Sequence, residues 1–195
     1  MKIKKAFDIC KKSHNIATFK INEEEQWLTN VFAAWPLCGV PDLSEEYICQ
    51  LYDITDKQSE KIHFQINMNV PKTLNFDDAC RYEIPAQPMT VNILIKGKGS
   101  LQPLLFERGL VLVEKVYLEP LTDTQEEDIS YWIRYIDNES FYVAVKVGLL
   151  LCAVIYPTPM TDSDYTAIES IYTAAVATMR DKILSEKTES HNQYD

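Results

Sequence analysis

Residues 26–47 read QWLTNVFAAWPLCGVPDLSEEY, and residues 144–165 read AVKVGLLLCAVIYPTPMTDSDY. Both stretches contain, at the same spacing, an apolar run, a turn-forming residue, a second apolar run, a proline, a helix-capping residue and a tyrosine. This order predicts a β-hairpin that leads into a capped helix, built once in each half of the chain. The equivalent positions hold Asn30, Pro41, Ser44 and Tyr47 in the first copy and Gly148, Pro159, Asp162 and Tyr165 in the second.

Each position of this repeat predicts a local structure. We expect Asn30 and Gly148 to take the left-handed backbone conformation at a hairpin turn, because both residue types accept it at low cost. Ser44 and Asp162 are expected to cap the helices, and the tyrosine of each copy is expected to anchor its helix in the core. Since turns and caps favour these residue types in any protein, either a duplication or local physics explains the pattern.

Hydrophobic periodicity outside the repeat predicts the remaining elements. Residues 3–13 form an amphipathic pattern, and the helices lie outside long β runs, which favours an α+β fold over a parallel α/β fold. We therefore expect two related halves, each with antiparallel β-hairpins and a capped helix. Strands are expected at residues 16–21, 61–68, 91–95, 101–106, 110–118, 131–136, 141–147 and 149–156. A last helix over residues 162–184 is expected to bury Tyr165, Ile168, Ile171, Tyr172, Ala175, Met179 and Ile183.

Composition along the chain divides it into four parts. Residues 1–70 form an N-terminal half, and residues 91–185 form a β-rich C-terminal half that ends in the last helix. Residues 71–90 carry Pro71, Pro85 and Pro88 among polar residues, which is typical of a linker. Residues 186–195 are polar and lack apolar periodicity, so we expect a flexible tail.

Charge and cysteine content limit the classes of function. The chain has 195 residues and a net charge of −10, which argues against a protein whose whole surface binds nucleic acid or anionic membrane. No apolar leader opens the sequence, and the longest apolar run, residues 143–156, is too short to cross a bilayer. The five cysteines are widely spaced beside apolar residues, so we expect buried, reduced thiols and a cytoplasmic location. They are Cys10, Cys38, Cys49, Cys80 and Cys152.

Three patterns in the sequence resemble motifs for metal or cofactor binding. Cys10 and His14 are four residues apart on the first helix, but no second pair completes a zinc site, so core packing explains Cys10 better. The glycines around Lys98 resemble a phosphate loop, but a strand rather than a helix follows them, which favours a hairpin turn. Asp162 and Asp164 are explained by helix capping and the helix dipole. We expect no metal, no cofactor and no catalytic activity.

Lysines on the first helix are the one concentration of positive charge. Lys4, Lys5, Lys11 and Lys12 fall largely on the polar face of residues 3–13, within an otherwise acidic chain. One interpretation is a solvated helix face. The other is a local contact with a phosphate backbone or an acidic partner, and these four lysines are the candidate contact residues.

Six short stretches spread over most of the chain carry a resemblance. They are QWL at residues 26–28, AAWPL at 33–37, YDITDKQ at 52–58, EKI at 60–62, EKVYLEPL at 114–121 and KVG at 146–148. Through them the chain resembles uncharacterised proteins encoded in prophages of gut Firmicutes. That resemblance implies a phage or mobile-element origin, and the family offers no activity to transfer.

A second resemblance concerns architecture. A basic helix, hairpins and a capped helix, repeated, are similar to the repeated unit of DNA sliding clamps, which are acidic rings lined by lysine-bearing helices. The resemblance implies that Lys4, Lys5, Lys11 and Lys12 face DNA. The chain departs from clamps in its shortness, in its other helices, which are not clearly basic, and in lacking a clamp motif.

These observations predict a non-catalytic binding module, with a clamp-like accessory of DNA metabolism as its sharpest version. Its partners would be another protein or further copies of itself, with a local DNA contact and no membrane. One alternative is an acidic inhibitor or adaptor of a host protein. Another is a small enzyme whose site is assembled from scattered polar residues.

Overall fold

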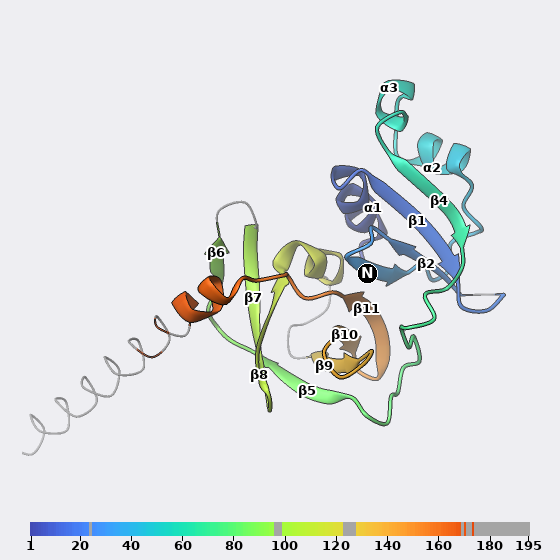
Figure 1. The fold of residues 1–195 in the computed structure, drawn as a ribbon. Helices are drawn as coiled ribbons and strands as arrows, with labels where there is room; N and C mark the ends of the chain where they lie inside the picture. The colour runs from blue at the N-terminus through green and yellow to red at the C-terminus, as the bar shows by residue number, and fades with distance from the viewer. Residues whose placement is uncertain (24, 96–98, 123–127, 169, 171–172, 174–195) are drawn as a thin grey trace, which may run out of the picture. The chain divides into compact units, whose positions relative to one another are not determined.

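The computed structural model describes residues 1–23, 25–95, 99–122, 128–168, 170 and 173 (Figure 1). Its helical elements are α1 (Ile3–Lys12), α2 (Glu45–Leu51), α3 (Asp56–Ser59) and the 3₁₀ helix η1 (Lys115–Leu121). The first strands are β1 (Asn15–Lys20), β2 (Gln26–Thr29), β3 (Ala33–Pro36), β4 (His63–Met68) and β5 (Ile84–Pro88). The others are β6 (Ile93–Ile95), β7 (Gly99–Phe106), β8 (Gly109–Glu114), β9 (Ile129–Tyr135), β10 (Phe141–Val147) and β11 (Leu150–Ile155).

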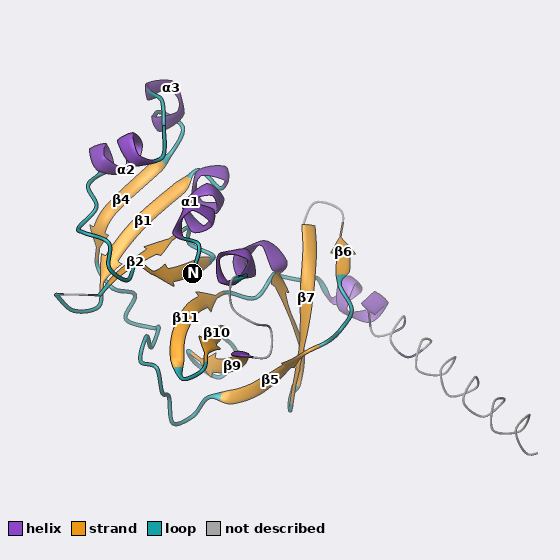
Figure 2. Ribbon diagram, turned by 180° about the vertical axis from the view of Figure 1, so that it is seen from behind, coloured by secondary structure: helices purple, strands orange, loops and turns teal. Residues whose placement is uncertain are grey.

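The described strands join in one mixed sheet, so the predicted α+β class is confirmed. Their order is β4-β1-β2-β3-β11-β10-β9-β5-β7-β6, with β8 paired to β7. All of these pairs are antiparallel except β1 with β4, which is parallel. A parallel pair needs a long crossover, and here β2, β3, α2 and α3 lie between the two strands in the chain. In Figure 2, α2 and α3 lie near one end of β1 and β4.

Strands from both predicted halves share this sheet. Ala34 of β3 pairs with Val154 of β11, and β5, inside the segment expected to be a linker, pairs with β9 and β7. The main hydrophobic core likewise contains Ile16 and Trp35 from the first half and Ile133 from the second. The chain separates into two compact units, Met1–Thr158 and Pro159–Asp195.

Both hairpins of the repeat are present, but one turn differs from its prediction. β2 pairs with β3, β10 pairs with β11, and Gly148 is left-handed at φ 60° as expected. In the first hairpin the left-handed residue is Val31, at φ 81°, and not Asn30. The side chain of Asn30 explains the shift, because its Oδ1 accepts hydrogen bonds from the backbone N–H groups of Phe32 and Ala33 at 3.1 and 2.9 Å. These Asx-type hydrogen bonds let Asn30 fix the turn although Asn30 itself is not the left-handed residue.

The helix starts of the repeat also differ from each other. Ser44 caps α2 as predicted, since its Oγ accepts a hydrogen bond from Tyr47 N at 3.1 Å. In the second copy the cap is Thr161 and not Asp162, because Thr161 Oγ1 accepts from Asp164 N while Asp164 Oδ2 accepts from Thr161 N. This reciprocal pair satisfies two helix N–H groups at once.

The tyrosines of the repeat are not core anchors. Tyr47 is 42% exposed and Tyr165 is 39% exposed, so that prediction is wrong. On α2 the neighbouring Ile48 is fully buried instead, because a helix turns successive side chains to different directions. Of the remaining predicted stripe, Ile168 is partly buried, and the other five positions lie outside the described residues.

Several smaller expectations were wrong. Only Cys10 is buried among the five cysteines; Cys38 is exposed because it follows β3 just before the left-handed Gly39, and all five thiols are free. Residues 115–118 form the start of η1 and do not extend β8.

In the part of the chain that the structure describes, no helix has both the length and the apolar character needed to cross a membrane.

Candidate anion-binding site

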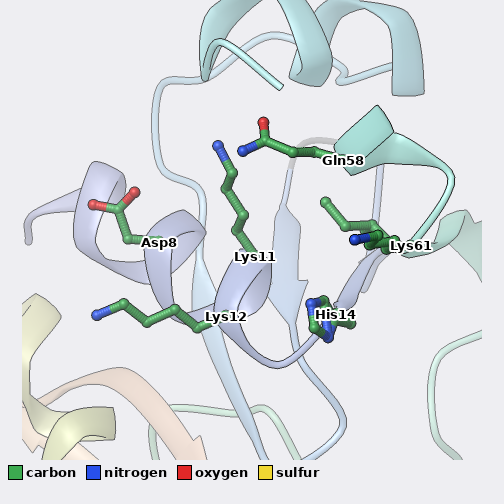
Figure 3. Close-up of a pocket in the computed structure, with 7 residues that line it drawn as sticks. Asp8, Lys11, Lys12, His14, Gln58 and Lys61 are labelled. Carbon is green, nitrogen blue, oxygen red and sulfur yellow. The ribbon is translucent and has the colours of Figure 1, made fainter. Parts of the chain in front are cut away.

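A pocket of about 430 Å³ lies beside the C-terminal end of α1 (Figure 3). Figure 3 shows Lys11 extending from α1 toward Gln58 of α3. Lys12 points in a different direction, back along the helix and away from Gln58 and Lys61. The lining contains three lysines and one histidine but a single carboxylate, that of Asp8. The lining residues are Asp8, Lys11, Lys12, His14, Gln58, Lys61 and Ile62.

Local structure explains how three segments reach this pocket. α1 buries Ala6, Phe7, Ile9 and Cys10, so Asp8, Lys11 and Lys12 are left on its opposite face. The helix ends at Lys12, and His14 turns the chain at φ 57° into β1.

The third segment is held by backbone and side-chain hydrogen bonds. His63 N donates to His14 O at 2.8 Å, which brings the start of β4, and with it Lys61, beside the end of α1. Gln58 is held by the capping box of α3, in which its Oε1 accepts from Thr55 N at 3.1 Å. The side-chain amide nitrogen of Gln58 is therefore the end available to donate into the pocket.

The electrostatics of the pocket favour an anion. Lys12, His14 and Lys61 are exposed and Lys11 is partly exposed, so these groups stay hydrated and can exchange water for a ligand. Lysine binds phosphate or carboxylate as a compact point charge with three donors. Within an acidic chain, this arrangement creates a local positive potential that attracts a negatively charged partner.

Two of the four predicted contact lysines reach the pocket. Lys11 and Lys12 line it, whereas Lys4 is exposed on the same helix outside the lining. Lys5 lies toward η1, where its Nζ is 3.8 Å from Glu119 Oε2. Both partners of that ion pair are well exposed, so it adds little to stability.

Sequence reasoning missed Lys61, Gln58 and His14 as members of the site. No local motif marks them, because their approach to α1 depends on the parallel pairing of β4 with β1. The pairing of Asn15 with His63 is a long-range contact. An alternating strand that starts with a lysine was the only signal in the sequence.

A buried ionic cluster is a second polar feature that the sequence analysis missed. Arg134 is 2% exposed, and its guanidinium contacts Glu83 Oε2 through Nε at 2.9 Å and Nη2 at 2.8 Å. Lys146 Nζ bonds Glu83 Oε1 and lies 4.9 Å from the ring centre of Trp132. The interruption of the apolar run by Lys146 was the available signal.

The same arginine fastens a loop to the sheet. Its Nη1 donates to the carbonyl oxygens of Asn75 and Asp77 at 2.9 and 2.8 Å, and Nη2 donates to that of Asp78 at 3.3 Å. Tyr142 adds a hydrogen bond from its hydroxyl to Asn75 O at 3.0 Å. Every N–H direction of Arg134 is used by protein groups, so the cluster is structural and offers no free donor to a ligand.

The described residues form neither a metal-binding site nor a reactive thiol site. Those residues contain no group of three or more histidines, cysteines or acids placed to hold a metal ion. Burial raises the pKa of the Cys10 thiol, which keeps this residue in its unreactive protonated form.

The chain was compared with known proteins by three routes. Models of protein families, curated proteins and solved structures all gave no match.

Proposed function

We propose that the protein is a non-catalytic binding module, of the prophage-encoded kind that its sequence resembles, and that its pocket holds an anionic group of a macromolecular partner. The observation that carries this proposal is that Lys11, Lys12 and Lys61, from two segments distant in the sequence, line one pocket. Cations gathered around one pocket repel one another, and a bound anion relieves that repulsion. Only Asp8 opposes them within the lining.

A single compact site fits this geometry better than a long lysine-lined surface. A clamp-like accessory of DNA metabolism needs all four lysines of α1 to face one phosphate backbone, and Lys5 instead contacts Glu119. The clamp-like version makes its own prediction: a closed oligomer by light scattering, and tighter binding to duplex DNA than to an acidic peptide of equal charge. A compact anion site predicts instead that the acidic peptide binds more tightly than duplex DNA of equal charge.

The first prediction concerns the pocket lysines. Changing Lys11, Lys12 and Lys61 together to glutamine should weaken binding of a fluorescent polyglutamate peptide by about 3- to 150-fold, since each of the three exposed charge pairs contributes about 0.2–1 kcal/mol. Fluorescence anisotropy at low salt measures this loss. Raising the salt should also weaken binding to the unmodified protein, because exposed charges are screened.

Lys4→Gln is the matched control for these substitutions. It removes the same charge from the same exposed helix face but outside the pocket, so it should leave affinity nearly unchanged. Equal losses from Lys4→Gln and Lys11→Gln would indicate a diffuse charge effect and contradict a discrete site. Circular dichroism checks that each variant remains folded.

The second prediction concerns Asp8 and has the opposite sign. Asp8→Asn removes the one carboxylate of the lining and should strengthen binding of the polyglutamate peptide by about two- to fivefold. A structural role for this residue would produce no gain in affinity. Unchanged or weaker binding of the Asp8→Asn variant would count against anion recognition in this pocket.

A further inference from the structure

The outer edge of β4 is an unused pairing surface next to the pocket. Among the strands that the structure describes, β4 pairs with β1 alone and ends the sheet (Figures 1 and 2). His63 N and Asn67 N point toward β1, where they donate to His14 O and Thr18 Oγ1. Because backbone groups alternate along a strand, the N–H and C=O groups of Phe64 and Ile66 point to the outer edge.

This edge lacks two of the usual protections against further pairing. β4 reads HFQINM and contains neither a charged residue nor a proline, the devices by which edge strands commonly avoid other chains. The regular part ends near Asn67, which is left-handed at φ 55° beside the register shift against β1. Residues 63–66 therefore present a short template for one more strand, without proline and without an acidic, lysine or arginine side chain.

Charge around the edge defines what would pair with it. Residues 61–76 contain no aspartate or glutamate although the chain as a whole carries 29 acidic residues. The basic pocket lies at the N-terminal end of β4, where Lys61 and His14 are. A strand that runs antiparallel to β4 brings its C-terminal end to this pocket.

We propose that β4 binds an extended segment of a partner protein that adds antiparallel to its outer edge and places acidic residues, C-terminal to the paired part, in the pocket. Backbone hydrogen bonds to Phe64 and Ile66 supply affinity, and the lysines select the acidic end. This inference rests on the proposed function, because it names the partner of the same pocket. Nucleic acid is the competing occupant, and it has no backbone donors to match the strand edge.

Three labelled peptides test the proposal on the full chain. The first alternates valine and threonine and ends in three glutamates; the second ends in glutamines; the third keeps the glutamates but carries N-methyl groups on the amides facing β4. Losing two backbone hydrogen bonds should weaken binding about tenfold, and losing the glutamates should weaken it by a similar factor. Hydrogen exchange should show the amides of Phe64 and Ile66 slowed by the first peptide.

The outcomes separate the two claims. If glutamines weaken binding but N-methyl groups do not, and the two amides exchange as before, strand addition is wrong and the anion site stands. If the glutamine-ended peptide binds as tightly as the glutamate-ended one, the pocket does not recognise anions and the proposed function is wrong. That conclusion holds whether or not the N-methyl groups weaken binding. Slowed exchange at Phe64 and Ile66 with duplex DNA in place of the peptide would also overturn a protein partner.

Discussion

Replacing Arg134 with methionine is expected to lower the free energy of unfolding by about 3–5 kcal/mol, the usual loss when one partner of a buried ion pair is removed. Methionine has a similar length but donates no hydrogen bond. Glu83, whose side chain is only 10% exposed, would keep Lys146 alone as its cation. The carbonyl oxygens of Asn75 and Asp77 would lose their donor in the same step.

Urea unfolding followed by circular dichroism measures this loss. Arg134→Lys is the matched control, since it keeps the charge but lacks the planar fork and should recover only part of the stability. The amide of Leu151, which donates to Asp78 Oδ1 at 2.7 Å, should exchange faster in Arg134→Met because the 75–78 loop is released. A loss below about 1 kcal/mol would show that the cluster contributes no more than a surface ion pair.

Replacing Trp35 with alanine is expected to lower the free energy of unfolding by about 3–5 kcal/mol, the range for large aromatic residues in cores. Trp35 is fully buried in the main core, where its ring lies 6.3 Å from that of Tyr117. Its Nε1 donates to Tyr117 O at 3.1 Å and so ties β3 to η1. Burial also raises the pKa of the Tyr117 hydroxyl to about 12, in keeping with a tightly closed core.

A series at this position distinguishes packing from hydrogen bonding. Trp35→Phe keeps most of the apolar volume and loses the N–H donor, so it should destabilise less than alanine, by roughly 1–3 kcal/mol. Thermal unfolding of both variants provides the comparison. Equal stability of Trp35→Ala and the unmodified protein would contradict the assignment of this residue to the core.

Local patterns predicted much of the fold correctly. The helix at residues 3–13, the two hairpins and the Ser44 cap follow from periodicity and turn chemistry acting over a few residues. The predictions were wrong where neighbouring residues compete for the same turn or capping hydrogen bond. Asn30 holds its turn through its side chain, and Thr161 takes the capping role because Asp164 can return the hydrogen bond.

The candidate site depends on contacts that no local pattern shows. Lys11 and Lys12 were predicted from the polar face of one helix, and that face is correct. Their association with Lys61 requires the parallel pairing of β4 with β1 across the intervening helices. Lys5 was predicted to share the site, but η1 lies close enough for Glu119 to pair with it.

An NMR titration that observes the lysine side chains tests the central claim most directly. Selectively labelled lysine ε-methylene groups would be followed while the polyglutamate peptide is added. The pocket account predicts that Lys11, Lys12 and Lys61 shift together with one half-saturation point, while Lys4 and Lys5 hardly move. Equal shifts at all the lysines of α1, or none at Lys61, would contradict a discrete anion-binding pocket.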